Sequence, residues 1–143
     1  MSKKTGFTLI ELTIVAAIFL LVMAALGPFV HMAKSRANRI SCANNLRKIS
    51  LGLHMYAADH KDIFPPDIDS LYPDYVDDPN VFDCPATKKA GKKSDPDYSY
   101  TTGLTEVSSP KEIIAQDIDT NHKRRGKNAV RINGSVEWIS AGR

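Results

Sequence analysis

The chain has 143 residues, 43% of them apolar, and its 19 basic and 16 acidic side chains give a formal net charge of +3. This charge is too balanced for a dedicated nucleic-acid binder, and the apolar content is too high for a disordered tail. Two cysteines are too few for a disulfide-dense mini-protein. The length fits one domain, or one domain with an appendage.

The apolar residues are concentrated near the N-terminus, where 19 of the 24 residues from Phe7 to Val30 are apolar and only Glu11 is charged. A helix of this length reaches about 36 Å, which is enough to cross a hydrocarbon core of about 30 Å. Lys3 and Lys4 precede the run and, by the positive-inside rule, place the N-terminus in the cytoplasm. The residues after Val30 are then expected outside the membrane.

Glu11 lies near the start of this run, and a carboxylate inside a membrane needs a partner. A secretory signal peptide is the alternative, but its apolar region spans about 7–15 residues, so this run is too long. Cleavage after Gly6 would leave a free amine on Phe7, one helical turn before Glu11. In a bundle of parallel helices, the carboxylate of one subunit would neutralise the amine of the next.

The string GFTLIEL, preceded by two lysines, resembles the prepilin leader of type IV pilins and type II secretion pseudopilins. The resemblance implies cleavage by a prepilin peptidase after Gly6, methylation of the new amine on Phe7 and an assembly role for Glu11. It also implies a disturbed helix at Gly27 and Pro28, because proline removes a backbone donor and kinks or opens a helix. An ordinary single-span anchor is the simpler alternative, and it does not explain this string.

Beyond the run, apolar and small residues recur at steps of three and four, which predicts that an amphipathic helix continues to Ala58. Pro65-Pro66 forbids further helix. The predicted apolar stripe comprises Ala33, Ala37, Ile40, Cys42, Leu46, Ile49, Leu53 and Tyr56. The basic residues nearby are interpreted as a solvated face, with phospholipid or DNA contact as the alternative; they are Lys34, Arg36, Arg39, Arg47 and Lys48.

The segment RISCANNLRKISLGLHMYAADHKDIFP resembles a helix found in a group of bacterial pilin-like proteins. The matching positions are Arg39, Cys42, Asn44, Asn45, Leu46, Tyr56, Asp59, Phe64 and Pro65. Members of this group carry a later Cys-Pro, matched by Cys84-Pro85, and a C-terminal stretch that fits His122, Gly126, Asn128, Gly134 and Val136. Asn133 and Ser135 depart from the aspartate and histidine usual there, so no role of those two residues is carried over.

We expect a leader over 1–6, a transmembrane or filament-core helix over 7–30 and a periplasmic or extracellular head over 31–143. In the head, a helix over 31–58 is followed by a loop over 59–97 and a sheet over 98–140. The loop is expected to pack Leu71, Tyr72, Tyr75, Val81 and Phe82 onto the helix. Strand candidates are 98–103, 112–118, 128–132 and 136–140, the last two joined by an Asn133-Gly134 hairpin turn. This arrangement is an α+β pilin fold, with one long helix packed on a small antiparallel sheet.

Cys42 lies on the predicted helix stripe, and Cys84 precedes a proline in the packed loop. A location outside the membrane allows a disulfide between them. Such a bond would close a loop of about 43 residues and contribute about 4 kcal/mol by the chain-entropy formula. Two buried free thiols are the alternative.

Two further groups of residues are candidate binding sites. Asp117 and Asp119 alternate with Asn121 in a pattern that can ligate calcium, but the glycine and terminal glutamate of an EF-hand are missing. Capping carboxylates at a strand end are the simpler interpretation, so no cofactor other than this possible calcium is predicted. A basic loop could contact DNA but lacks interleaved aromatic residues, which makes DNA binding the weaker interpretation. Its residues are Lys123, Arg124, Arg125 and Lys127.

The sequence has no nucleophile elbow, P-loop or dinucleotide-binding fingerprint, so neither a catalytic residue nor an enzyme activity is predicted. The resemblance predicts a structural subunit of a type II secretion pseudopilus or a type IV pilus. Its partners would be other pilin-like subunits, the prepilin peptidase and an inner-membrane assembly platform. It would cross the inner membrane once and then enter a periplasmic pseudopilus or a cell-surface pilus. A minor or tip pilin that binds DNA or an exported substrate is the alternative.

Overall fold

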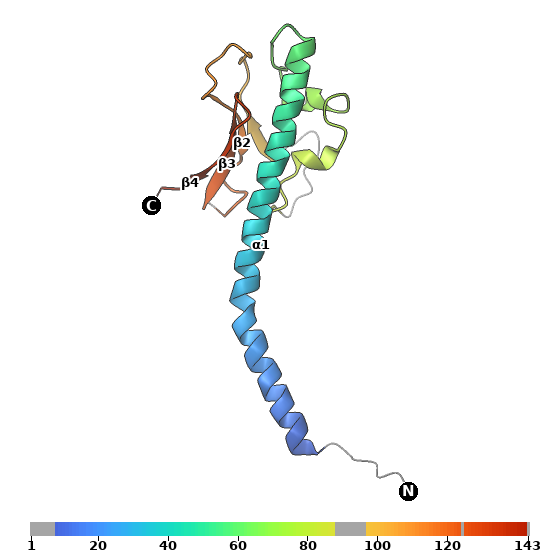
Figure 1. Ribbon diagram of the computed structural model, residues 1–143, viewed down its shortest axis with the longest axis vertical. Helices are drawn as coiled ribbons and strands as arrows, with labels where there is room; N and C mark the ends of the chain where they lie inside the picture. The colour runs from blue at the N-terminus through green and yellow to red at the C-terminus, as the bar shows by residue number, and fades with distance from the viewer. Residues whose placement is uncertain (1–7, 88–96, 124, 143) are drawn as a thin grey trace. The chain divides into compact units, whose positions relative to one another are not determined.

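The computed structural model describes residues 8–87, 97–123 and 125–142, the side chain of Pro28 excepted. Within these residues, one long helix, α1 (Leu9–Asp59), is followed by two 3₁₀ helices, η1 (Ile68–Leu71) and η2 (Pro79–Phe82) (Figure 1). Four strands come next, β1 (Tyr98–Tyr100), β2 (Ile113–Asp117), β3 (Gly126–Arg131) and β4 (Val136–Ser140). Contacts divide the chain into two units, Met1–Lys34, here called the N-terminal unit, and Ser35–Arg143, here called the head.

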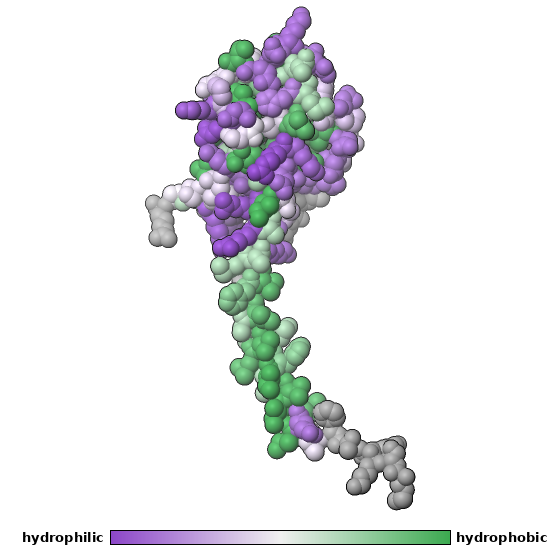
Figure 2. Space-filling model, viewed as in Figure 1, coloured by the Kyte–Doolittle hydropathy of each residue, from purple (hydrophilic) through white to green (hydrophobic). Residues whose placement is uncertain are grey.

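The N-terminal unit contains the first half of α1, and its described side chains are exposed on every side of the helix. The helix is long and apolar enough to cross a membrane, and its most apolar window has no residue buried within the chain. Figure 2 shows this surface as a hydrophobic band along the helix. The backbone of α1 continues through Gly27 and Pro28 without a break. Apolar surface of this extent is stable only when lipid or other helices cover it.

The head contains a four-stranded antiparallel meander in the order β1-β2-β3-β4. β3 and β4 form the predicted hairpin, with paired positions from Gly126 and Ser140 to Val130 and Val136. Gly134 adopts a φ of 76° in the turn, a conformation that glycine reaches without strain. The structure therefore confirms the predicted fold class, in which a long helix packs on a small antiparallel sheet.

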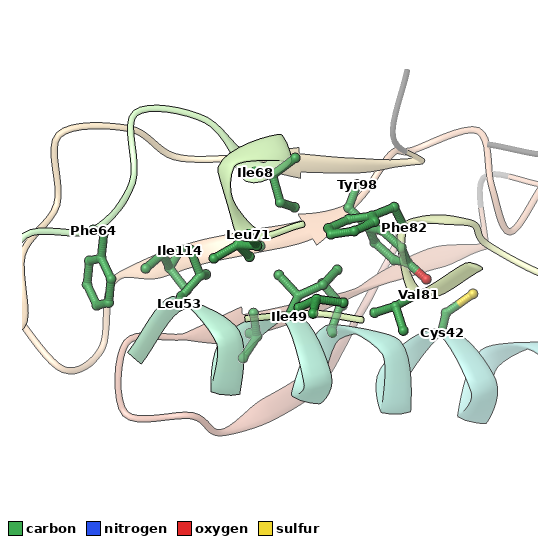
Figure 3. Close-up of a cluster of buried hydrophobic side chains, with 14 of the residues drawn as sticks. Cys42, Ile49, Leu53, Phe64, Ile68, Leu71, Val81, Phe82, Tyr98 and Ile114 are labelled. Atoms are coloured by element: carbon green, nitrogen blue, oxygen red, sulfur yellow. The ribbon is translucent and has the colours of Figure 1, made fainter. Parts of the chain in front are cut away.

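One face of α1 in the head supplies part of the hydrophobic core. Figure 3 shows Ile49 and Leu53 of the helix facing Leu71, Phe82 and Ile114, and all five side chains are buried. The buried hydrophobic residues of α1 recur at steps of three and four and are Cys42, Leu46, Ile49, Leu53 and Ala57. The 3.6-residue period places these positions on one side of the helix, where the sheet and the loop cover them.

Burial within the chain begins after the first three positions of the predicted apolar stripe. Ala33 and Ala37 are exposed, and Ile40 keeps 61% of its surface accessible. The first buried position of the stripe is Cys42. The pattern predicts an apolar face of the helix, and a face is buried only where another part of the protein covers it.

The segment between α1 and β1 contains more regular structure than the predicted loop. Asp67 caps η1 by accepting a hydrogen bond from the Ser70 amide at 2.8 Å, and Asp78 caps η2 by accepting one from the Asn80 amide at 3.0 Å. Side-chain caps of this kind satisfy amides that short helices leave unpaired. The loop residues Leu71, Val81 and Phe82 are buried as predicted, and Tyr72 and Tyr75 are half-buried.

Asn45 links the buried face of α1 to the loop and the sheet. Its amide group donates to the Asp83 carbonyl at 2.9 Å and to the Tyr98 hydroxyl at 3.3 Å. Burial raises the pKa of Tyr98, so this phenol stays protonated and donates in turn to the Asp83 carbonyl. The Asn45 amide nitrogen, the Tyr98 hydroxyl and the Asp83 carbonyl are therefore hydrogen bonded to one another, as buried polar groups require.

Gly126 begins β3 at a position where a side chain cannot be accommodated. Its φ is +146°, and a Cβ atom there would lie 2.4 Å from the Ile139 carbonyl oxygen and 2.7 Å from Cζ2 of Trp138. The missing side chain is what allows Trp138 to lie against the start of the strand. The strand begins two residues before the predicted position, because Gly126 pairs with Ser140 of β4, although strand propensity disfavours glycine.

Gly126→Ala is expected to destabilise the head by at least about 2 kcal/mol, because the strained φ alone costs about 1–3 kcal/mol and the overlap with Trp138 adds to it. Urea unfolding of the full chain in detergent, followed by fluorescence of the single tryptophan, measures this effect. Gly142→Ala is the matched control, since a Cβ there meets nothing within 4 Å. Equal unfolding midpoints for the two variants would contradict the steric account.

Candidate functional site

Glu11 forms a capping box with Thr8 at the start of α1. The Thr8 amide donates to Glu11 Oε2 at 2.9 Å, and the Thr8 hydroxyl donates to the same oxygen at 2.8 Å. In return, Thr8 Oγ1 accepts a hydrogen bond from the Glu11 amide at 3.3 Å. This reciprocal pattern satisfies two amides at the helix N-terminus, and its signature is the Thr-x-x-Glu in TLIE. Sequence reasoning missed this capping box, although the Thr-x-x-Glu pattern could have identified it.

The capping box places the Glu11 carboxylate beside the point where the mature chain would begin. Gly6 and Phe7, the predicted cleavage and methylation positions, lie outside the described residues. Thr8 follows Phe7 directly and is hydrogen bonded to Glu11. The carboxylate is exposed and negatively charged at a helix N-terminus, where the helix dipole favours an anion. The arrangement can present a carboxylate to a cation on another chain.

Cys42 and Cys84 form a disulfide in the head, which confirms the predicted pairing. Their Cα atoms are 5.6 Å apart, and both residues are buried. The bond joins the first buried position of α1 to the segment that follows η2. It crosslinks residues 42 positions apart in the sequence, so it restricts a long segment of the unfolded chain.

Asp117 and His122 lie next to this disulfide. His122 Nε2 is 3.0 Å from Asp117 Oδ2 and 3.8 Å from Cys84 Sγ. Asp117 Oδ2 also accepts hydrogen bonds from the amide and the side-chain amide of Asn128, each at 2.8 Å. The other oxygen, Asp117 Oδ1, is buried and has no hydrogen-bond partner among the described residues. We call these four residues, Cys42, Cys84, Asp117 and His122, the disulfide cluster.

Trp138 of β4 packs over the imidazole of this cluster. Its ring contacts His122 edge-on, with centroids 5.4 Å apart, and the Arg39 guanidinium lies 4.1 Å from the centre of a Trp138 ring. Asn128, which holds Asp117, also donates to the Arg39 carbonyl of α1 at 3.2 Å. The cluster is thereby enclosed between the helix and the hairpin β3–β4. Sequence reasoning missed it because its members are separated by long stretches of chain.

The structure does not bring together the two aspartates of the predicted calcium pattern. Asp117 is 1% exposed, whereas the Asp119 side chain is 79% exposed and pairs with Lys127 at 3.0 Å. Asn121 donates its side-chain amide to the Asp97 carbonyl at 2.6 Å. Calcium binding stays a prediction. In this arrangement Asp117 is buried, Asp119 pairs with Lys127 and Asn121 is hydrogen bonded to Asp97.

The basic residues of the predicted DNA-contacting loop also differ in their surroundings. Lys123 and Arg125 are exposed, Arg124 lies outside the described residues, and Lys127 is engaged by Asp119. An ion pair of this kind reduces the positive charge that the loop offers to a phosphate. DNA contact at this loop stays a prediction.

Two family models match the chain. The prokaryotic N-terminal methylation motif matches residues 1–27, and a family described as a protein of unknown function (DUF1559) matches residues 32–80. Together, these two matches support a type IV pilin-like protein. No curated protein and no solved structure matches it.

The methylation motif in this pilin-like chain implies processing by a prepilin peptidase and assembly with other pilins. Together with the apolar helix, the motif indicates membrane anchoring. Pilin-like families are generally structural rather than enzymatic. The second match covers Arg39, Cys42 and the core face of α1, but it ends before Cys84 and the other members of the disulfide cluster.

Reducing the disulfide of the pilin-like chain in chelator-containing buffer should lower its free energy of unfolding by up to about 4 kcal/mol, because the unfolded chain regains loop entropy. Urea unfolding of the oxidised and reduced full chain in detergent gives the difference. A Cys42→Ala/Cys84→Ala double variant is the control and should unfold like the reduced chain. If the oxidised and reduced chains have the same unfolding midpoint, the disulfide does not stabilise the head.

Proposed function

We propose that the chain is a subunit of a type II secretion pseudopilus or a type IV pilus, cleaved after Gly6, methylated on Phe7 and polymerised through the first half of α1. The observation that supports this most strongly is the N-terminal unit itself, a helix with apolar side chains on all sides and one carboxylate in its first turn. Packing against other copies of the same helix would remove this apolar surface from lipid or water.

Glu11 is proposed to set the register between neighbouring subunits. The hydrogen bonds of its carboxylate within the described chain end on Oε2, which leaves Oε1 to accept a donor from another chain. Cleavage after Gly6 would provide that donor as the amine of Phe7 in the next subunit. An amine and a carboxylate in apolar surroundings each lose water, so each stabilises the other and an unpaired member is strongly disfavoured.

The proposed topology keeps the N-terminus in the cytoplasm and the head outside the inner membrane. Lys3 and Lys4 support this orientation by the positive-inside rule. The Cys42–Cys84 disulfide supports it independently, because disulfides persist in oxidising compartments outside the cytoplasm. The head would then lie in the periplasm or on the cell surface after assembly.

Glu11→Gln tests the proposed charge pairing. Glutamine also completes a capping box, so the helix start is retained while the negative charge is lost. We expect Glu11→Gln and Glu11→Ala to insert into the membrane normally and to yield at least about tenfold less filament, because losing one partner of a buried ion pair costs about 3–5 kcal/mol. Filaments sheared from cells and membrane fractions are quantified by immunoblot.

Thr8→Ala is the matched control, since it removes the cap but keeps the carboxylate. It should lose about 1 kcal/mol of helix stability and still assemble. Filament yields from Glu11→Gln equal to those of the unmodified chain would show that the charge does not set the register.

A further inference from the structure

The disulfide cluster contains the donor set of a zinc site. We propose that, when the disulfide is reduced, Cys42, Cys84, Asp117 and His122 bind one Zn²⁺ ion with tetrahedral geometry. One ligand atom from each of the four residues lies within 4.8 Å of the other three, and all four residues are buried. This proposal concerns the head alone and does not depend on the proposed filament.

The distances within the cluster are close to those of a tetrahedral zinc centre. Zinc bonds of about 2.0–2.3 Å place a nitrogen and a sulfur ligand about 3.6 Å apart, and a nitrogen and an oxygen ligand about 3.4 Å apart. The corresponding distances from His122 Nε2 are 3.8 Å to Cys84 Sγ and 3.0 Å to Asp117 Oδ2. In the reduced chain the two sulfurs need to separate to about 3.8 Å.

The direction of the contacts also favours a metal over an activated thiol. In a thiol activated by a histidine and an aspartate, the imidazole uses one nitrogen for the sulfur and the other for the carboxylate. Here the sulfur and the carboxylate both face Nε2 of His122. Donor atoms that converge on one point are the arrangement that a shared ion requires.

Asp117 provides a second and independent observation. Its Oδ2 is held by two hydrogen bonds from Asn128, whereas its Oδ1 is buried and lacks a partner among the described residues. A buried carboxylate whose second oxygen has no partner is unfavourable, and a cation held at Oδ2 would offset the negative charge that the two oxygens share. Asn128 would then act as the outer group that orients a ligating carboxylate, as metal sites commonly require.

The donor types select zinc over the calcium considered for Asp117 from the sequence. Two thiolates and an imidazole are soft or borderline ligands, which zinc accepts together with one carboxylate, whereas calcium and magnesium take oxygen ligands. Cysteine and histidine dominate closed structural zinc sites with four protein ligands. The burial of all four residues matches such a structural site and leaves no open position for a substrate.

Zinc binding requires reduction of the disulfide first. A protein or small-molecule dithiol would transfer two electrons and two protons to the Cys42–Cys84 bond, becoming a disulfide itself and leaving two thiols in the head. Zn²⁺ would then bind both sulfurs as thiolates and release two protons to solvent. The head therefore has two alternative crosslinks between α1 and the loop after η2, a disulfide under oxidising conditions and a zinc ion under reducing ones.

Metal titration of the full chain in detergent, without a polyhistidine tag, tests this proposal. The chain is reduced anaerobically with a phosphine, which becomes a phosphine oxide, and is titrated with Zn²⁺ against a chromophoric chelator. We expect one zinc ion per reduced chain and none per oxidised chain. With Co²⁺ as the probe, the reduced chain should show a thiolate-to-cobalt charge-transfer band and the visible bands of a tetrahedral site.

Asp117→Asn and His122→Gln should weaken zinc binding by at least about 100-fold, since outer-shell substitutions alone cost about 10–100-fold. Asp119→Asn and His60→Gln are matched controls at exposed positions and should bind like the unmodified chain. Each variant is first checked in its oxidised form by circular dichroism. If a variant fails to fold, the cobalt spectrum of the unmodified chain and its loss in Cys42→Ser/Cys84→Ser decide the question.

The proposal is overturned if the reduced chain binds no zinc, or if folded Asp117→Asn and His122→Gln bind it as tightly as the controls. Uptake of Ca²⁺ in place of Zn²⁺ by the reduced chain would also contradict it. A cobalt spectrum without thiolate bands would show that the metal binds elsewhere.

Discussion

The apolar surface on the first half of α1 is the constraint on which the rest of this molecule depends. No described part of the chain covers it, and its extent far exceeds what a soluble monomer tolerates. Lipid can cover this surface in the membrane, and other helices of the same kind can cover it in a filament. Because both surroundings are apolar, the single carboxylate in the first turn requires a cation, and the proposed cleavage after Gly6 would provide one next to it.

The head depends on a different constraint, because it must form a hydrophobic core from one helix face, four short strands and the loop between them. The buried residues of α1 begin at Cys42, and the same residue is crosslinked to Cys84. The disulfide thus fixes the loop where the core begins. The polar cluster around Asp117, held by Asn128 and covered by Trp138, connects this crosslink to the hairpin. The stability of the head and the proposed metal binding therefore depend on the same few residues.

Much of this fold follows from periodicity in the sequence. Alternation predicted β4 with the bounds that the structure has, and steps of three and four predicted the buried face from Cys42 onward. The same steps continue through Ile40, which is exposed, because periodicity records amphipathic character and not the presence of a covering partner. The 3₁₀ helices were missed because four residues contain too little of any period. The disulfide cluster was missed because local patterns do not report that His122 and Cys42 lie close in space.

Mass spectrometry of the native N-terminus tests the central claim most directly. The account predicts that the chain isolated from its own cells begins at Phe7 and that its α-amino group carries a methyl group. This amine is the cation that Glu11 requires in apolar surroundings, and cleavage at any other position would put it out of reach of the carboxylate. An isolated filament or membrane fraction in which the chain still begins at Met1 would contradict the account.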